Sequence, residues 1–416
     1  MSIVTLQHAG RTDVGIVRAN NEDAFLIDDV TRLYIVCDGV GGRAGGEVAS
    51  RTAAEYVAER LREHQSDLDK AHRGELRLQK RQIAGWLEEA ISDASGAVRE
   101  RASNKPELSG MATTIAAALV VGSQAYIAHV GDSRVYLVRH KTLHQLTEDH
   151  SVINDLRRRG AQDGDRSHLG GAFQGALTRA LGVLNTARVD MLDFELLPGD
   201  RIILCSDGVY SVVGDTTTMQ AIAPHGDVST AVHMFIDTSL QSGAPDNATV
   251  VVVDVAQEQA EDRVGRVRRR LEALQAISMF RYLPYPDLMR VASVAKEMPF
   301  QAGTTIFDEG VPGDSLFVIL EGNVGVVKSG VEITTLGEGA HFGEMSLIER
   351  LPRSAGIVAK TPVQALVIER DGFFSLLREE VTAVKLLWGM VRMLNARLRS
   401  TSDELTSLKT HYGIDG

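Results

Sequence analysis

Two apolar runs in this sequence stop abruptly at an Asp-Gly pair. The run "YIVC" leads into Asp38 and Gly39 and then into a glycine-rich stretch, and the run "RIILCS" leads into Asp207 and Gly208. Runs of this kind predict buried β-strands, so each strand ends in a carboxylate. Two interpretations stay open, because Asp-Gly is common in turns and because glycine lets a backbone approach an ion or a phosphate closely.

Further carboxylates lie at the ends of other predicted strands. Asp132 follows "AYIAHVG", Asp246 precedes "NATVVVV", and Glu22 and Asp23 lie in "VRANNEDAF". Each alone is better explained as a turn or capping residue, but carboxylates gathered at strand ends repel one another unless a cation lies among them. Hard oxygen ligands suit Mg²⁺ or Mn²⁺, whereas zinc favours His and Cys. We therefore expect a site for divalent metal ions.

Length, charge and cysteine content narrow the class of protein. The 416 residues exceed one ordinary core and predict two domains. The net charge of -11 argues against nucleic acid or an anionic membrane as the main partner. Cys37 and Cys205 both lie in apolar runs, which predicts buried thiols in a reducing compartment. Because the N-terminal segment lacks a signal-peptide pattern and no run is long enough to span a membrane, we expect a soluble, cytoplasmic protein.

The hydrophobic pattern changes near residue 255. Before it, apolar runs alternate with helices predicted at Glu47–Leu61 and Leu76–Arg101, which is typical of sheets covered by helices. After it comes a charged helical segment, and Met298–Leu377 then shows short strands with frequent glycines, as in a small β-barrel. We expect a first domain at 1–255, a helical linker at 256–278, a β-barrel at 279–380 and a C-terminal helix at 381–412.

The predicted C-terminal helix carries a long apolar seam. Its positions with 4-3 spacing are Leu387, Val391, Leu394, Leu398, Thr401, Leu405 and Leu408. The helix either packs on its own barrel or forms the seam of a parallel homodimer. We favour the homodimer, because the seam continues beyond the part that a small barrel can cover.

The first 255 residues resemble the metal-dependent type 2C Ser/Thr protein phosphatases. The shared motifs are "VRANNEDAF", "VCDGVGG", "SGMATT", "VGDSRVYLVR", "LTEDHSVI", "LTRALG", "ILCSDGVYSVV" and "DNATVVVV", in the order that the family has them. The ordered set is far more specific than any one motif. The resemblance implies an α+β protein with an α/β/β/α sandwich, and hydrolysis of phosphoserine and phosphothreonine on protein substrates.

The resemblance also implies a dinuclear Mn²⁺ or Mg²⁺ centre at one edge of the sandwich. Asp38 would bridge both metal ions. Asp207 and Asp246 would complete the first metal site, and the carbonyl of Gly39 would bind the second ion. Two divalent ions can lower the pKa of a shared water and stabilise in-line attack on phosphorus.

Other residues take supporting roles in the same comparison. Glu22, together with Asp23, would hold metal-bound water. Arg18 would bind the substrate phosphate, since a guanidinium can donate to two phosphate oxygens at once. Asp132 would join Asp207 at a third metal site. The expected catalytic residues are Arg18, Asp38, Asp207 and Asp246.

The sequence departs from the family pattern at three positions. Val40 stands where some members have a general-acid histidine, so the leaving alkoxide is expected to be protonated in another way. Ser211 replaces an acidic residue that often completes the third metal site, which weakens the expectation of a third ion. Ala112 replaces a glycine. Residues Asp149–Leu177 resemble the segment that forms a mobile flap in the family.

The second half resembles cyclic nucleotide-binding domains of the catabolite-activator type over about Phe280–Arg399. "AHFGEMSLIERLPRSAG" resembles their phosphate-binding cassette. The resemblance implies that Arg353 pairs with the cyclic phosphate and that Glu344 accepts from the ribose 2′-hydroxyl. The nucleotide-binding residues implied are Gly343, Glu344, Met345, Ser346, Arg353 and Ser354. Ser354 leaves cAMP and cGMP both open, with cAMP favoured, and Asn395 is a candidate for capping the base.

The leading hypothesis is a Ser/Thr phosphatase that a cyclic nucleotide regulates allosterically, with activation as the expected sign. One alternative is a non-catalytic cyclic nucleotide receptor or scaffold with a phosphatase fold. Another is an active phosphatase whose cassette no longer binds nucleotide. Too few residues follow the C-terminal helix for a helix-turn-helix, so DNA binding is not expected.

Overall fold

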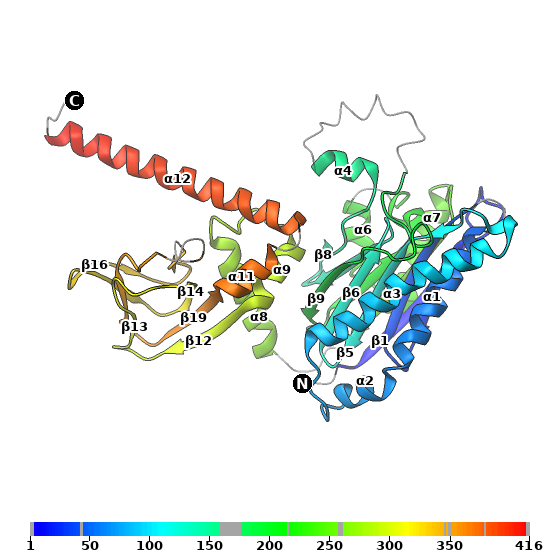
Figure 1. Ribbon diagram of the computed structural model, residues 1–416, viewed down its shortest axis with the longest axis horizontal. Helices are drawn as coiled ribbons and strands as arrows, with labels where there is room; N and C mark the ends of the chain where they lie inside the picture. The colour runs from blue at the N-terminus through cyan, green and yellow to red at the C-terminus, as the bar shows by residue number, and fades with distance from the viewer. Residues whose placement is uncertain are drawn as a thin grey trace. The chain divides into compact units, whose positions relative to one another are not determined.

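The chain forms two compact units, Met1–Ala260 and Glu261–Gly416, and each is described by itself. The computed structural model describes residues 4–41, 45–158, 176–213, 216–256, 261–344, 347, 351–377 and 380–412. Figure 1 shows the two units coloured along the chain. In these described segments, no helix has both the length and the apolar character needed to cross a bilayer.

One antiparallel sheet of the first unit has Asp38 at the end of an inner strand. Its strand order is β2 (Asp23–Asp28), β3 (Leu33–Val40), β5 (Ile115–Val121), β6 (Gln124–Val130) and β9 (Asp190–Glu195), and short β4 (Ala112–Thr113) pairs with β3. The helices on its outer face are α1 (Gly45–Arg62), α2 (Gln65–His72) and α3 (Lys80–Ser103), and a 3-10 turn follows at Pro106–Leu108. This sheet therefore presents one face to helices.

The second antiparallel sheet carries the other acidic strand ends. Its order is β1 (Leu6–Asp13), β11 (Ala248–Val255), β10 (Arg201–Cys205), β7 (Arg134–Arg139) and β8 (Thr142–Gln145). The helices beside it are α5 (Asp207–Tyr210), α6 (Thr216–Ile222) and α7 (Val228–Gln241), and α4 (Val152–Arg158) lies in the connection after β8. Strands β10 and β11 contact strands of the first sheet, so the two sheets pack face to face.

Burial explains why the strand sequences are almost continuously apolar. Every residue of β5 and the first five residues of β3 are buried. A strand that is covered on both faces has no solvent-facing side, so it loses the polar alternation of a half-exposed strand. The α/β/β/α sandwich predicted from the sequence is confirmed. The second predicted helix begins at Lys80 and not at Leu76, because Gln79 still has extended backbone.

The second unit is a β-barrel made of two four-stranded antiparallel sheets. One sheet has the order β12 (Ala295–Phe300), β19 (Val363–Glu369), β14 (Ser315–Glu321) and β17 (His341–Phe342). The other has the order β13 (Thr305–Phe307), β18 (Gly356–Ala359), β15 (Val324–Lys328) and β16 (Val331–Leu336). Aromatic side chains fill its interior, where the Phe317 and Phe342 rings stack with centroids 5.0 Å apart.

Helices cover one outside face of this barrel. They are α8 (Glu261–Ala276), α9 (Tyr285–Val294), α11 (Arg370–Leu376) and α12 (Glu380–Tyr412). Leu274 of α8 and Phe280 after it are fully buried in the core that these helices share with β14 and β19. The segment expected to be a linker helix is therefore packed into the second unit.

Helix α12 has one buried and one exposed apolar face. Leu386, Met390 and Met393 are buried in the core of the second unit. Gly389 lies so close to the backbone that a Cβ there would be 2.0 Å from the carbonyl oxygen of Met279. The other face leaves Val384, Leu387, Trp388, Val391, Leu394 and Leu398 between 47% and 66% exposed. The buried face thus matches the interpretation in which the helix packs on its own unit. The exposed apolar face matches the interpretation in which the helix forms the seam of a homodimer.

Candidate active site

The predicted acidic residues meet at one edge of the first unit. A cavity of about 680 Å³ lies there. Its polar lining includes Arg18, Glu22, Asp38, Thr114, Asp132, Arg179, Arg188, Asp207, Asp246 and Asn247, together with the backbone of Gly39. The strand ends converge because β3 belongs to one sheet and β10 and β11 to the other, and the sheets pack against each other.

Asp38 is anchored through its backbone at the end of β3. Its N–H donates to the hydroxyl of Thr114 (2.9 Å), and its carbonyl oxygen accepts from the N–H of Thr114 (2.9 Å) and from the hydroxyl of Thr113 (2.9 Å). The Thr114 hydroxyl also lies 2.6 Å from that of Ser133. These bonds use the backbone groups, which leaves the Asp38 carboxylate to face the cavity.

The carboxylates in this region raise one another's pKa. Burial, followed by the charges of Asp23 and Asp207, raises the pKa of Asp38 well above its usual value. Burial and then the charge of Asp207 raise the pKa of Asp132 to about 7. Burial and then Asp246 raise the pKa of Asp207. A cation among these groups would remove the repulsion, so the charge distribution suits a metal site.

The chemistry of the donors also fits a metal ion. Oδ1 of Asp207 is buried and has no hydrogen-bond partner in the part of the chain that the structure describes. A buried carboxylate oxygen without a partner is costly unless it coordinates an ion. The surrounding donors are carboxylate and carbonyl oxygens, which magnesium and manganese prefer.

Asp23 lies beneath the cavity and does not line it. It is opposite Asp38 in the β2–β3 register, and its side chain is only 8% exposed. Its Oδ2 accepts from the hydroxyl of Ser206 (2.7 Å), and Thr249 also bonds to the carboxylate. Burial, against these two hydrogen bonds, raises its pKa to about 7. Asp23 thus supports the residues that flank the cavity.

The loop that carries Arg18 and Glu22 is organised by Asn247. The side-chain amide of Asn247 donates to the carbonyl oxygens of Val14 and Asn20 (2.9 Å each), and its Oδ1 accepts from the N–H of Glu22 (2.8 Å). Sequence analysis did not single out this residue. The signal that could have found it is its place directly after Asp246, where a turn side chain commonly bonds to backbone.

Arg18 forms an ion pair with Asp246 across the mouth of the cavity. Its Nη2 lies 2.7 Å from Oδ2 of Asp246, and its side chain is half exposed. The other oxygen of Asp246 accepts from the N–H of Asn247 (2.9 Å). Burial raises the pKa of Glu22, while the charge of Arg18 lowers it. The positively charged guanidinium of Arg18 therefore lies at the open side of the acidic cavity.

The two Asp-Gly pairs have a steric explanation. A Cβ on Gly39 would lie 2.1 Å from the carbonyl oxygen of Gly46 and 2.6 Å from that of Glu22. A Cβ on Gly208 would lie 1.9 Å from the carbonyl oxygen of Asn247. Close backbone packing around each carboxylate, and not turn geometry alone, thus requires glycine at both positions.

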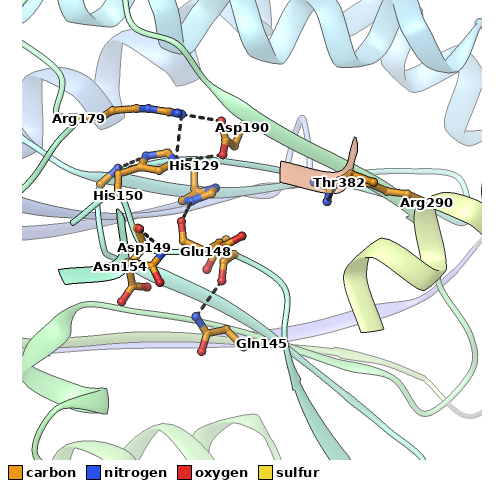
Figure 2. Close-up of polar contacts among 12 residues, drawn as sticks. His129, Gln145, Glu148, Asp149, His150, Asn154, Arg179, Asp190, Arg290 and Thr382 are labelled. Carbon is orange, nitrogen blue, oxygen red and sulfur yellow. Dashed lines mark hydrogen bonds and ion pairs between the residues drawn. The ribbon is translucent and has the colours of Figure 1, made fainter. Parts of the chain in front are cut away.

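A cluster that sequence analysis missed lies along the wall of the cavity. Nη1 of Arg179 donates to Oδ1 of Asp190 (2.7 Å), and Nε2 of His150 lies 3.0 Å from Oδ2 of the same carboxylate. The ring of His129 stacks on that of His150 at 4.5 Å. Figure 2 shows how Asp190 links Arg179 to His150. Arg179, which lines the cavity, is held in place by the partly exposed Asp190, which in turn bonds to the buried His150.

We assign no metal to this histidine cluster, although His129, His150 and Asp190 lie within coordinating distance of one another. The N–H of Gly131 donates to Nδ1 of His150 (3.1 Å), so the proton of a neutral ring lies on Nε2 and points at Asp190. Nε2 of His129 lies 2.9 Å from the carbonyl oxygen of Glu148 and donates to it. Hydrogen bonds therefore occupy both ring nitrogens of His150 and Nε2 of His129.

In the second unit, Arg353 of the predicted nucleotide cassette is buried. Its Nη1 donates to the carbonyl oxygens of Ser315 (3.0 Å) and Gly343 (3.2 Å), and its guanidinium lies 4.1 Å from the ring centroid of Phe307. Gly343 has a φ of +83° and packs against this guanidinium, so a side chain there would be strained. Glu344 is also buried.

Two predicted cassette residues are outside the part that the structure describes. They are Met345 and Ser346, so the roles of these two residues stay predictions. Ser354 is exposed next to Arg353. Most of the predicted flap, 159–175, is likewise outside the described residues.

Comparisons with known proteins decide the family. The family model of protein phosphatase 2C matches residues 16–242, and that of the cyclic nucleotide-binding domain matches residues 297–380. The chain belongs to the protein phosphatase 2C family. Serine/threonine phosphatase stp of Listeria welshimeri is 34% identical over 249 residues, which are 59% of this chain and 94% of that protein.

Two solved structures of the family share the fold of the first unit. The crystal structure of the Mycobacterium tuberculosis serine/threonine phosphatase PstP has a TM-score of 0.52 at 33% identity and covers 61% of this chain and 100% of its own. Stp1 from Staphylococcus aureus has a TM-score of 0.53 at 28% identity and covers 62% and 98%. This phosphatase 2C protein is therefore a protein-serine/threonine phosphatase, and the catalytic hypothesis is favoured over the scaffold alternative.

The acidic cluster predicts a pH-dependent response of the fold to metal. A carboxyl whose pKa is raised in the folded state opposes folding increasingly as the pH rises from its unfolded-state pKa, about 4, to its folded-state pKa, and fully above it. Asp132 and Asp23 each have a pKa of about 7. At a pH below this value they hold protons that compete with a cation, and at a pH above it they are charged. We expect Mn²⁺ to raise the melting temperature by at least about 5 °C more at pH 8 than at pH 5.5.

Circular dichroism melts of the full chain with Mn²⁺ and with EDTA at both pH values measure this difference. His129 is buried and His144 is partly buried, and burial lowers the pKa of each to about 4, but both contribute alike with Mn²⁺ and with EDTA and so cancel. An equal rise at the two pH values would contradict the metal assignment of the cluster.

Proposed function

We propose that this protein hydrolyses phosphoserine and phosphothreonine on proteins at a two-metal centre in the cavity, and that a cyclic nucleotide bound to the second unit regulates this activity. The observation that carries the proposal is the convergence of four aspartates in one cavity, where Oδ1 of Asp207 is buried and has no hydrogen-bond partner among the described residues. Burial and neighbouring charge raise the pKa of three of them, Asp38, Asp132 and Asp207. A related structure, the catalytic domain of PstP in complex with two manganese ions, supports Mn²⁺ as the metal. Mg²⁺ is the alternative.

Four groups would hold the two metals. Asp38 would bridge both ions, Asp207 and Asp246 would complete the first site, and the carbonyl oxygen of Gly39 would bind the second ion. When bound, two divalent ions activate water and neutralise the charge of the phosphoryl group. Asp132 faces Asp207 closely enough for their charges to interact, and these two would form a third site if one is used.

The remaining residues act on substrate and water. Glu22, at the cavity wall, would orient the attacking water by accepting a hydrogen bond, and Asp23 would hold the framework beneath it. Asp246 would hold metal through its carboxylate, and the guanidinium of Arg18, which forms an ion pair with that carboxylate here, would donate to two phosphate oxygens. Val40 cannot protonate the leaving alkoxide, so that proton would come from water in the cavity.

Replacing the bridging carboxylate tests the metal centre. Asp38→Asn keeps the shape but removes one negative ligand, so we expect Mn²⁺-dependent hydrolysis of a phosphothreonine peptide to fall at least about a hundredfold. Metal-free Asp38→Asn should be at least as stable as the wild type at pH 8, because repulsion is reduced. Asp29→Asn, at a side chain that is 75% exposed, is the matched control. Near-normal activity of Asp38→Asn would refute the assigned role.

The second unit would bind the nucleotide through Arg353 and Glu344. The guanidinium of Arg353 bonds to two neutral carbonyl oxygens, and a cyclic phosphate would offer it a charged acceptor, which makes a stronger hydrogen bond. Glu344 would accept from the ribose 2′-hydroxyl. cAMP is the favoured ligand and cGMP the alternative. Regulation requires that the nucleotide bind two states of the protein with different affinity, and activation is the proposed sign.

Arg353→Ala tests this assignment. We expect cAMP affinity, measured by calorimetry on the full chain, to fall roughly 10- to 100-fold, as for loss of hydrogen bonds to a charged group. Hydrolysis should then no longer respond to cAMP. Lys296→Ala, at an exposed ion pair with Glu369, should keep both properties. If the wild type binds cAMP without any change in hydrolysis, the regulatory part of the proposal is wrong.

We also propose a parallel homodimer through α12. Its exposed face has Val384 and Val391 one heptad apart and Leu387 and Leu394 in the alternate positions, and this choice of residues favours two-stranded coiled coils. A seam of half-exposed apolar side chains on one helix is typical of an interaction surface. The heptad continues at Leu398.

Light scattering over a concentration series tests the dimer. Leu394→Glu places a charge in the seam and should shift the mass toward the monomer. Arg399→Glu, on the same helix outside the seam, reverses a charge and should not. A wild type that is monomeric at the highest concentration would contradict the proposal.

The cytoplasm is the proposed compartment. Cys37 and Cys205 are both buried free thiols. Burial, followed by nearby carboxylate charge, raises the pKa of Cys37, which makes its thiol unreactive. The proposed partners there are a phosphorylated protein and a cyclic nucleotide.

A further inference from the structure

Three large apolar side chains are exposed around the catalytic cavity. Val40, Val183 and Leu184 all line it, and they are 47%, 56% and 66% exposed. Single exposed apolar residues are normal on protein surfaces. These three share one cavity with the proposed metal ligands, and two of them are consecutive in the chain, which sets them apart from scattered surface residues.

The turn that carries Val183 and Leu184 is fixed from behind by helix α3. The buried hydroxyl of Ser95 donates to the carbonyl oxygen of Leu184 (2.6 Å) and accepts from the N–H of Gly182 (3.0 Å). Nη1 of Arg99 donates to the carbonyl oxygen of Val183 (2.6 Å). The backbone polar groups of the turn therefore point toward α3, and the two apolar side chains are left on the cavity side.

Close packing restricts the turn further. Gly182 has a φ of +92°, and a Cβ there would lie 2.6 Å from the side chain of Val98 on α3. A Cβ on Gly96 of the same helix would lie 3.0 Å from the carbonyl oxygen of Asn185. A turn that is held this tightly presents Val183 and Leu184 at a defined place, as a binding subsite requires.

We propose that Val183 and Leu184, together with Val40, form a subsite for a large apolar side chain that flanks the phosphorylated Ser or Thr of the substrate. The inference rests on the proposed function, because it assumes that the phosphate binds at the acidic end of the same cavity. An apolar wall beside a few convergent polar groups is the usual composition of a ligand site. Burying the substrate side chain there removes apolar surface of both partners from water.

The occupant is a substrate residue and not a general apolar partner, because the patch is continuous with the catalytic cavity. The competing occupant is the chain's own segment 159–175, which lies outside the described residues. A cover made of that segment would affect all substrates alike. A substrate subsite affects only peptides that carry the apolar side chain, so the two can be distinguished by kinetics.

The experiment compares phosphothreonine peptides as substrates of the 416-residue chain with Mn²⁺. Each peptide of the series has one Leu at one of the three positions on either side of phosphothreonine, and its other residues are Gly and Ser. The reference peptide has Gly and Ser at all of these positions. For the wild type we expect kcat/KM to rise roughly tenfold with Leu at one or two positions, as for a small apolar group in a hydrophobic pocket. Leu184→Ser and Val183→Ser should lose this preference and keep the wild-type rate on the reference peptide.

The control variant is Val30→Ser. Val30 is 45% exposed and does not line the cavity, so Val30→Ser replaces an exposed apolar side chain by a polar one and leaves the subsite unchanged. It should keep the preference for Leu. Ser95→Ala, which loosens the turn that carries Leu184, should weaken the preference for Leu. It should leave the rate of hydrolysis of the reference peptide unchanged.

Three outcomes would overturn the inference. A wild type that hydrolyses every peptide at the same rate has no apolar subsite. A Leu184→Ser variant that slows the reference and the Leu peptides equally acts through the chain itself and not through substrate recognition. A wild type that hydrolyses no peptide with Mn²⁺ would refute the proposed function first, and the subsite with it.

Discussion

Electrostatic repulsion among partly and fully buried carboxylates is the constraint on which the first unit depends. Asp38 ends a strand of one sheet, and Asp207 begins a helix after a strand of the other, so packing the two sheets face to face forces their charges together. Burial raises the pKa of both, and neighbouring charge adds to the rise, from Asp23 and Asp207 at Asp38 and from Asp246 at Asp207. A fold that needed only stability would place apolar groups there, since uncompensated buried charge destabilises a protein. The charge distribution at this edge of the sandwich therefore suits cations, in keeping with the two-metal centre proposed above.

The acidic edge keeps its shape because neutral groups hold its backbone. Thr113 and Thr114 fix the end of β3, and Asn247 joins the turn before β11 to the loop of Arg18. Glycines after the two aspartates allow backbone segments to approach within contact distance. These contacts carry no charge, so they persist whether or not the carboxylates are ionised. The electrostatic function and the mechanical support of the site are thus divided between different residues.

The second unit shows a similar division between a fixed and an open side of one helix. Asp287 of α9 is buried, and although burial tends to raise its pKa, Lys385 and Arg290 lower it. Lys385 and Thr382 of α12 both bond to this carboxylate at 2.8 Å. Together with the close approach at Gly389, this ion pair ties the start of α12 to its own unit, while the apolar stripe on the other side stays exposed. A nucleotide that acts through α12 would have to work against this attachment.

The sequence by itself determined the identity of the acidic strand ends and the two-domain order, and it favoured a divalent ion that prefers oxygen ligands, because continuous apolar runs, Asp-Gly pairs and oxygen ligands are local features. It could not show that Asp23 lies beneath the cavity or that Asn247 organises the loop that carries Arg18 and Glu22. Nor could it show that Asp190, which also bonds to His150, holds Arg179 in the cavity wall. Those facts depend on which strands become neighbours, and only the packing of the two sheets decided that. No sequence pattern singles out Val183 and Leu184, and only the hydrogen bonds from α3 to their turn give them a fixed place in the acidic cavity.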